Sequence, residues 1–201
     1  TLCSTPCMLN TNDKMPFQLD EKFQRGISLV SYLPDEYLQT QAIESLDNIK
    51  KTHAQWIALV TTWYQNNKSS INIFPDIDKT PNDAGLVKII EAAHNKGLEV
   101  MLKPHVDLKS EEWRGNIEFN SESEYQAWFL AYENFIMHYA DLAQTNKVEQ
   151  LCVGTEFVSL TNKENEWRNI ISNIKSHYEG KLVYSENHDN IENNKWFGDL
   201  D

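Results

Sequence analysis

The chain has 201 residues, of which 40% are hydrophobic and 24% charged, so it is long enough for one substantial core. Its 30 acidic and 18 basic side chains give a net charge of −12. A chain of this charge does not attract nucleic-acid phosphates or an anionic membrane surface, and we expect no nucleic-acid partner. No apolar run reaches the roughly 20 residues needed to cross a membrane, so we also expect no transmembrane segment.

Residues 1–22 are polar and aperiodic, and we predict that they form a tail before a domain over residues 23–201. They contain no apolar stretch of the kind found in a signal peptide. Because the chain starts at Thr1 rather than Met, we expect a processed or trimmed product of a secreted or cell-envelope protein, with an export signal removed or absent. Cys3 and Cys7 are too few and too close to define a disulfide framework or metal site, and Cys152 is interpreted as a small buried hydrophobe.

Short apolar runs alternate with stretches of helical periodicity along the rest of the chain. The predicted strands are residues 27–30, 56–60, 98–102, 151–153 and 182–184. Helices are predicted between and after them, beginning at Thr40, at a Thr80 cap with Pro81, at a capping box of Ser121 and Glu124, and at another of Thr161 and Glu164. Trp196 and Phe197 are predicted to approach a sixth strand.

Alternation of this kind predicts parallel strands joined by right-handed crossovers, which a doubly wound sheet and a barrel share. No Gly-x-Gly-x-x-Gly or phosphate loop follows the first strand. This disfavours a nucleotide-binding sheet, and we expect no cofactor. Polar and aromatic residues follow every strand, as around a barrel mouth. We therefore predict an α/β fold of the (β/α)8 TIM-barrel type, incomplete at about five βα units and the start of a sixth, since eight units need about 250 residues.

The stretch from Leu151 to Glu156 reads as a buried strand that ends on a carboxylate. The carboxyl ends of barrel strands carry the active site, so Glu156 is the catalytic candidate. A helix cap or an ion pair with a lysine is the alternative. Glycoside hydrolysis needs one carboxylic acid to protonate the leaving oxygen and a second carboxylate as nucleophile or base, and Glu156 suits the first of these roles.

Other side chains at the same edge are candidates for contacts with a sugar. They are Trp63, Tyr64, Lys103, His105, Trp113, Arg114, Glu186 and Asn187. Aromatic rings in a cleft stack on sugars, and the polar groups bind hydroxyls. The alternatives are packing under a loop for Trp63 and Tyr64, ion pairs for the basic residues, and solvent exposure for Glu186.

Further segments stand in order along the chain: residues 25–28 (RGIS), 56–59 (WIAL), 92–94 with 97–98, 100–105 (VMLKPH), 113–115 (WRG) and 153–156 (VGTE). Taken together, they resemble Glycoside Hydrolase Family 113. The resemblance implies a retaining clan A barrel enzyme with endo-β-1,4-mannanase activity on a mannan-like, β-linked polysaccharide. It implies that Glu156 is the general acid/base, and that the nucleophilic glutamate follows the seventh strand, beyond Asp201. We therefore interpret the chain as part of a longer enzyme.

Two alternatives remain. One is a carbohydrate-binding protein that kept part of the barrel without catalysis. The other is a metal-dependent barrel hydrolase, for which suitable ligand types are present at His105, Asp107, Glu156, His188 and Asp189. The chain has no His-x-His after the first strand and no His-Glu-x-x-His, so we expect no metal.

Overall fold

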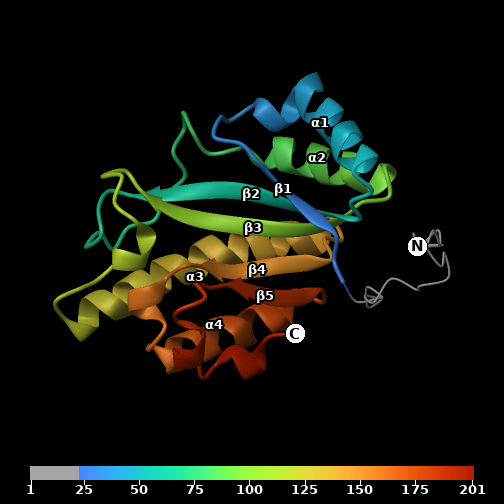
Figure 1. The fold of residues 1–201 in the computed structure, drawn as a ribbon. Helices are drawn as coiled ribbons and strands as arrows, with labels where there is room; N and C mark the ends of the chain where they lie inside the picture. The colour runs from blue at the N-terminus through green and yellow to red at the C-terminus, as the bar shows by residue number, and fades with distance from the viewer. Residues whose placement is uncertain (1–22) are drawn as a thin grey trace, which may run out of the picture.

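The computed structural model describes residues 23–201, so the predicted tail with Cys3 and Cys7 lies outside the described part. Five parallel strands form one sheet in the order β1-β2-β3-β4-β5 (Figure 1). They are Gly26–Val30 (β1), Trp56–Gln65 (β2), Glu99–Leu108 (β3), Gln150–Thr155 (β4) and Lys181–Ser185 (β5). A doubly wound sheet reverses its strand order at a switch point, whereas this order follows the sequence throughout. The predicted barrel-type α/β fold is confirmed, with five strands described.

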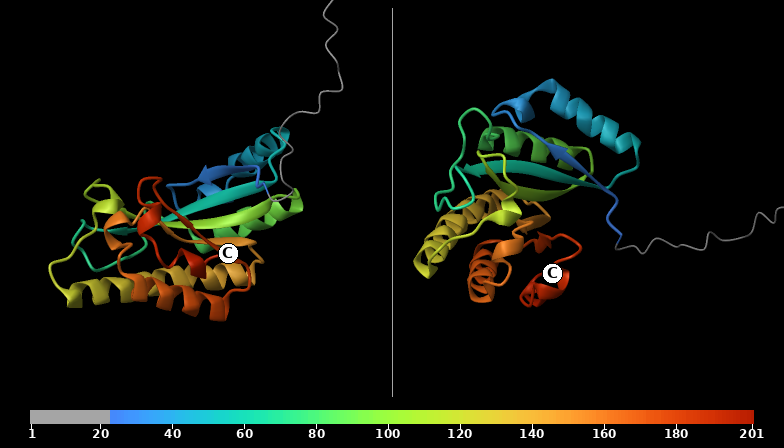
Figure 2. Two further views of the ribbon diagram at one scale, coloured as in Figure 1. Left: turned by 60° about the horizontal axis from the view of Figure 1, so that its bottom comes forward. Right: turned by 60° about the vertical axis from the view of Figure 1, so that its left-hand side comes forward.

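Four α-helices follow β1 to β4 in turn and cover the outer side of the curved sheet (Figures 1 and 2). They are Thr40–Lys51 (α1), Asp83–Asn95 (α2), Glu122–Thr145 (α3) and Glu164–His177 (α4). None of the described helices is both long enough and apolar enough to span a bilayer. The core lies between the helices and the sheet, and its largest side chains include the fully buried Trp128, Tyr132 and Trp167.

The two longest strands place alternate side chains on opposite faces of the sheet. On β3, Val100, Leu102 and Val106 are fully buried under the helices. Lys103, His105 and Asp107 alternate with them and are only partly buried, so they lie on the inner face. This alternation is how one strand contributes both to the core and to the barrel mouth.

Two of the three predicted helix caps are wrong. Ser121 does cap α3, since its side chain accepts a hydrogen bond from the backbone amide of Glu124. The cap of α2 is Asn82, which accepts from the amide of Gly85 at 2.7 Å, whereas the Thr80 hydroxyl donates to the Thr62 carbonyl. Thr161 bonds to the carbonyl of Val158 instead of capping α4.

The segment after β5 reaches the edge of the sheet through two 3-10 helices, Ile191–Asn193 and Phe197–Asp199. Trp196, predicted to approach a sixth strand, is fully buried and stacks on Trp167 with ring centroids 4.9 Å apart. The backbone amide of Asp201 then donates to the carbonyl of Leu182 in β5 at 3.1 Å. The last residue therefore lies alongside the outer edge of β5.

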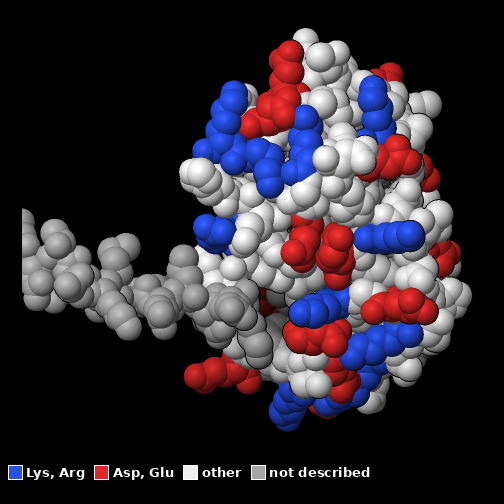
Figure 3. Space-filling view, turned by 90° about the vertical axis from the view of Figure 1, so that its right-hand side faces the viewer, with Lys and Arg blue, Asp and Glu red and all other residues white. Residues whose placement is uncertain are grey.

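The two ends of the strands differ in chemical character. The end where the strands begin carries Lys and Arg interspersed with Asp and Glu over its visible face (Figure 3). The ion pair between Lys96 and Asp47 lies at this end, where α1 and α2 finish. Aromatic and polar side chains meet at the opposite end, where the strands finish, and a cavity opens there.

Candidate active site

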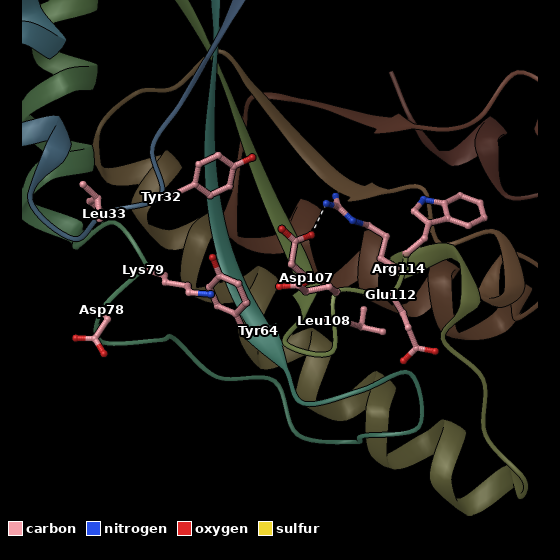
Figure 4. A pocket seen from close by; sticks show the side chains of 11 residues that line it. Tyr32, Leu33, Tyr64, Asp78, Lys79, Asp107, Leu108, Glu112 and Arg114 are labelled. Atoms are coloured by element: carbon pink, nitrogen blue, oxygen red, sulfur yellow. Dashed lines mark hydrogen bonds and ion pairs between the residues drawn. The ribbon is translucent and has the colours of Figure 1, made fainter.

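The cavity lies beyond the carboxyl ends of β1, β2 and β3 and has a volume of about 640 Å³ (Figure 4). Its lining consists of Tyr32, Leu33, Tyr64, Asp78, Lys79, Asp107, Leu108, Glu111, Glu112, Trp113 and Arg114. Tyr32 and Trp113 leave 56% and 46% of their surface exposed, which makes their rings accessible to a bound molecule. Aromatic surface combined with a few fixed polar groups is typical of a ligand site.

The Trp-Arg-Gly segment connects this cavity to β4. The indole Nε1 of Trp113 donates a hydrogen bond of 3.3 Å to Oε2 of Glu156. A Cβ atom on Gly115 would lie 2.4 Å from the Trp113 ring, so only glycine lets the indole fold back over this turn. Arg114 pairs with Asp107 at the end of β3 (Figure 4). Each of the three residues thus has a separate structural task.

Glu156 directly follows β4 in a strained backbone conformation. Its φ of 56° lies in the left-handed region, which non-glycine residues seldom occupy and which is enriched at functional sites. The pairing of β4 with β5 is irregular between Cys152 and Thr155, and such irregularities re-aim side chains at the ends of strands. The carboxylate is partly exposed beside the cavity, as a group that acts on a bound molecule must be.

The turn at Glu156 is held by β5. The backbone amide of Glu156 donates to the carbonyl of Ser185 at 2.8 Å, and that of Phe157 donates to the hydroxyl of Tyr184 at 3.1 Å. The ring of Tyr184 fills the space above Gly154, where a Cβ atom would lie 2.5 Å from it. Tyr184 was not among the predicted site residues; the glycine two residues before Glu156 was the only sequence signal of a close neighbour.

The inner face of β3 carries Lys103 and His105, which alternate with the buried Pro104. The Nζ of Lys103 donates to the Ser185 hydroxyl at 3.0 Å, crossing β4 to reach β5. Burial, reinforced by the positive charges of Arg114 and Lys103, lowers the pKa of His105 to about 3. His105 is therefore neutral at neutral pH. Its buried Nε2 has no hydrogen-bond partner within the described residues, and neither has the hydroxyl of Thr62 on the neighbouring strand.

Trp63 and Tyr64 do not form one platform. Both lie within β2, which extends to Gln65 rather than ending at residue 60. Tyr64 lines the cavity, with the Lys79 ammonium 5.5 Å from its ring centroid. Burial, followed by the nearby carboxylates of Asp107 and Asp76, raises the pKa of Tyr64 to about 12. The phenol is therefore protonated and able to donate at neutral pH.

The ring of Trp63 points to the helical side of the sheet. It packs against Phe135, His138 and Tyr139 of α3 with centroid distances of 5.4, 5.5 and 6.1 Å. Successive strand residues face opposite sides, and this places Trp63 outside the group of predicted sugar contacts. Its inclusion beside Tyr64 is corrected on that ground.

The residues after β5 divide into two kinds. The Oε2 of Glu186 accepts hydrogen bonds from the side-chain amides of Asn190 and Asn194, at 3.2 and 3.1 Å. This carboxylate organises its own loop instead of standing exposed, as the alternative for it supposed. Asn187 is different: its Nδ2 is buried and has no partner among the described residues, so it retains an unused donor.

The residue types named for a metal site do not come together. Within residues 23–201, no three His, Cys, Asp or Glu side chains lie close enough to share a metal ion. His188 and Asp189 are exposed in the loop after β5. Cys152 is buried in β4, as predicted, and burial raises the pKa of its thiol.

Three solved structures resemble this chain over 89% of its length. A complex of a GH113 β-1,4-mannanase has 26% identity and a TM-score of 0.85. The GH113 β-mannanase AaManA from Alicyclobacillus acidocaldarius, in complex with ManMIm, has 27% identity and a TM-score of 0.85. A further GH113 β-1,4-mannanase has 25% identity and a TM-score of 0.80. No curated protein sequence matches the chain significantly.

The chain spans 60%, 59% and 61% of the lengths of these three structures. The sequence profile of Glycoside Hydrolase Family 113 matches residues 32–201. This range contains the cavity, the Trp-Arg-Gly segment and Glu156, and it confirms the resemblance found in the sequence. The chain belongs to Glycoside Hydrolase Family 113.

Proposed function

We propose that this chain is the acid/base-bearing part of a retaining endo-β-1,4-mannanase, with Glu156 as the general acid and base. The observation that carries the proposal is the placement of Glu156. It emerges from a strained turn at the end of β4, and its carboxylate contacts the indole that lines the cavity. Strain of this kind persists only where the surrounding structure enforces it.

The chemistry follows from this placement. In the first step a carboxylic acid protonates the glycosidic oxygen while a second carboxylate attacks the anomeric carbon. In the second step the same group, now ionised, takes a proton from the water that cleaves the glycosyl-enzyme bond. Trp113 donates to the Oε2 of Glu156, and this bond holds the carboxyl group beside the cavity.

We propose that the nucleophile belongs to a part of the protein outside these 201 residues. Residues 23–201 supply five strands, and the chain spans about 60% of the length of the GH113 structures that it resembles. Glu186 follows the strand adjacent to β4, and its Oε2 already accepts two amide hydrogen bonds. Adjacent strands also approach a sugar from the same side, whereas a retaining pair must flank the scissile bond about 5–5.5 Å apart.

The cavity supports a β-linked polysaccharide as the substrate. The exposed rings of Trp113 and Tyr32 offer faces on which a pyranose stacks. Neutral His105 and protonated Tyr64 offer uncharged groups for sugar hydroxyls. Structures of this family carry the name β-1,4-mannanase, and on that basis we propose mannan. Because a polymer does not cross a membrane, we also propose that the protein acts outside the cell or in the cell envelope.

The test is Glu156→Gln in the complete protein that contains this chain, assayed on β-1,4-mannan. Loss of the acid should lower kcat by at least about 100-fold while the KM for mannan stays within about threefold. Glu179→Gln, an exposed carboxylate before β5, is the matched control and should retain full activity. Unchanged turnover in the Glu156 variant would exclude this residue from the mechanism.

The same assay decides between an enzyme and a binding protein. A non-catalytic relative would bind mannooligosaccharides in calorimetry and release no reducing sugar in the wild-type form. Release of sugar with retention of the β-configuration, followed by NMR of the anomeric proton, supports the proposed mechanism. Net inversion would contradict it.

A further inference from the structure

The backbone conformation at Glu156 is unfavourable by itself and needs contacts with neighbouring residues to stabilise it. A left-handed φ of 56° is unfavourable for glutamate, and the adjoining pairing of β4 with β5 is irregular. Two hydrogen bonds fix the turn, one at the backbone amide before the Glu156 α-carbon and one at the next amide after it. One joins the amide of Glu156 to the carbonyl of Ser185, and the other joins the amide of Phe157 to the hydroxyl of Tyr184. The second is the only one of the pair made by a side chain.

The Tyr184 ring is seated so that its hydroxyl has little freedom. It meets Trp167 and Trp196 edge-on, with centroid distances of 5.5 and 5.0 Å. It also contacts Phe197, with ring centroids 5.6 Å apart. One edge of the ring lies over Gly154, where any Cβ atom would collide with it. These ring contacts therefore fix the Tyr184 hydroxyl next to the backbone amide of Phe157, the residue that follows the proposed acid.

We propose that Tyr184 is the positioning residue that aims Glu156 at the glycosidic oxygen, an inference that rests on the proposed function of Glu156. Catalytic groups must be held within about 0.5 Å of their productive geometry. A displacement of about 1 Å costs on the order of 100-fold in rate. Tyr184 touches neither cavity nor carboxylate in the described contacts, and it acts through the backbone of Phe157.

The experiment compares Tyr184→Phe with Tyr178→Phe in the complete protein. Each change removes one hydroxyl from a tyrosine ring. Tyr178 is buried beside β4, and its hydroxyl donates to the carbonyl of Val148 at 2.7 Å, at the end of the barrel away from Glu156. The two variants should lose similar thermal stability, so Tyr178→Phe shows what a purely structural hydroxyl contributes.

The first readout is activity on two substrates. Natural mannan needs an acid to protonate its poor leaving group, whereas a dinitrophenyl β-mannobioside does not. Tyr184→Phe should lower kcat/KM on mannan at least about tenfold, with kcat falling and KM steady, and lower kcat/KM on the aryl substrate less than about threefold. Tyr178→Phe should leave both within about twofold. Equal losses on the two substrates, or equal losses in the two variants, would overturn the proposal.

The second readout does not depend on activity. The backbone amide of Phe157 should exchange with deuterium faster in Tyr184→Phe than in the wild type, because it has lost its acceptor. In Tyr178→Phe its exchange should be unchanged. If the wild type hydrolyses neither substrate, the proposed function fails. The exchange of this amide then still decides whether Tyr184 holds the turn, and unchanged exchange in Tyr184→Phe would show that it does not.

Discussion

The indole Nε1 of Trp113 lies 3.3 Å from Oε2 of Glu156 and joins the loop after β3 to the turn after β4. The ring is 46% exposed at the cavity, so one side chain presents a flat surface to a ligand and a donor to the carboxylate. The two properties are separable by substitution, because phenylalanine keeps a ring and lacks the donor.

The first prediction separates these roles of Trp113. Trp113→Phe should keep the KM for mannan within about threefold and lower kcat, because the carboxylate loses its hydrogen bond and stacking survives. Trp113→Ala should in addition raise KM about tenfold or more, the equivalent of about 1.4 kcal/mol or more of lost binding. Steady-state kinetics on mannooligosaccharides measure both. An unchanged kcat in Trp113→Phe would show that the hydrogen bond has no role in turnover.

The second prediction concerns the glycine of the Val-Gly-Thr-Glu segment. Gly154→Ala should destabilise the fold by about 1–3 kcal/mol because its methyl group meets the Tyr184 ring in a packed core, at 2.5 Å from the nearest ring atom. Gly198→Ala is the control, since a Cβ atom there has nothing within 4 Å. Urea unfolding of the two variants gives the comparison, and equal stabilities would contradict the packing argument.

The third prediction addresses the Arg114–Asp107 ion pair, in which the side chains are 13% and 30% exposed. Arg114→Met and Asp107→Asn should each lower stability, since each leaves a partly buried charged side chain without the opposite charge that faces it. The double variant should lose less than the sum, with a coupling energy of about 0.5–3 kcal/mol. A double-mutant cycle by urea unfolding measures this. Simple additivity would mean that the pair is fully screened by solvent.

The fourth prediction is a pH dependence caused by His105, whose pKa falls from 6.5 to about 3 on folding. Between these values the unfolded chain binds about one more proton at this residue than the folded chain does, so stability rises with pH across this window. Above pH 6.5 the imidazole is neutral in both states and its burial does not lower stability. As the pH falls from 6.5 toward 3, the free energy of unfolding decreases because only the unfolded chain takes up the proton.

His105→Gln should therefore flatten the fall in the free energy of unfolding between pH 6.5 and pH 4, relative to the wild type. His188→Gln, which alters an exposed histidine after β5, should leave the slope unchanged. Urea unfolding at several pH values provides the slopes. A wild-type slope in the His105 variant would show that this imidazole titrates normally in the folded protein.

The strand-helix alternation was predictable because apolar runs and helical stripes differ in period. The strand ends were not. β2 and β3 extend to Gln65 and Leu108, five and six residues past the predicted ends. Near the barrel mouth the inner face of a strand is polar, so residues such as Lys103 and His105 resemble a loop. Their alternation with the buried Leu102 and Val106 has the period of a strand. This period would have predicted that β3 continues past residue 102.

The candidate site was predictable only in part. Glu156 could be found from its place after a buried strand, and the pairing of Arg114 with an acid was among the alternatives considered. The opposite orientations of Trp63 and Tyr64 depend on strand register, which short apolar runs do not determine. Tyr184 was not predicted because its hydroxyl contacts a backbone amide, that of Phe157 just after the neighbouring strand. A contact of this kind leaves no local sequence pattern.

The positive φ of Glu156 also has a consequence for the thermal stability of the protein. Glycine adopts a left-handed turn without the steric penalty that glutamate incurs, so Glu156→Gly should melt at a higher temperature than Glu156→Gln. Thermal stability alone would thus favour glycine over the acidic residue at this position. Glutamate at this position therefore lowers the melting temperature of the fold and supplies the carboxylate that the proposed reaction needs.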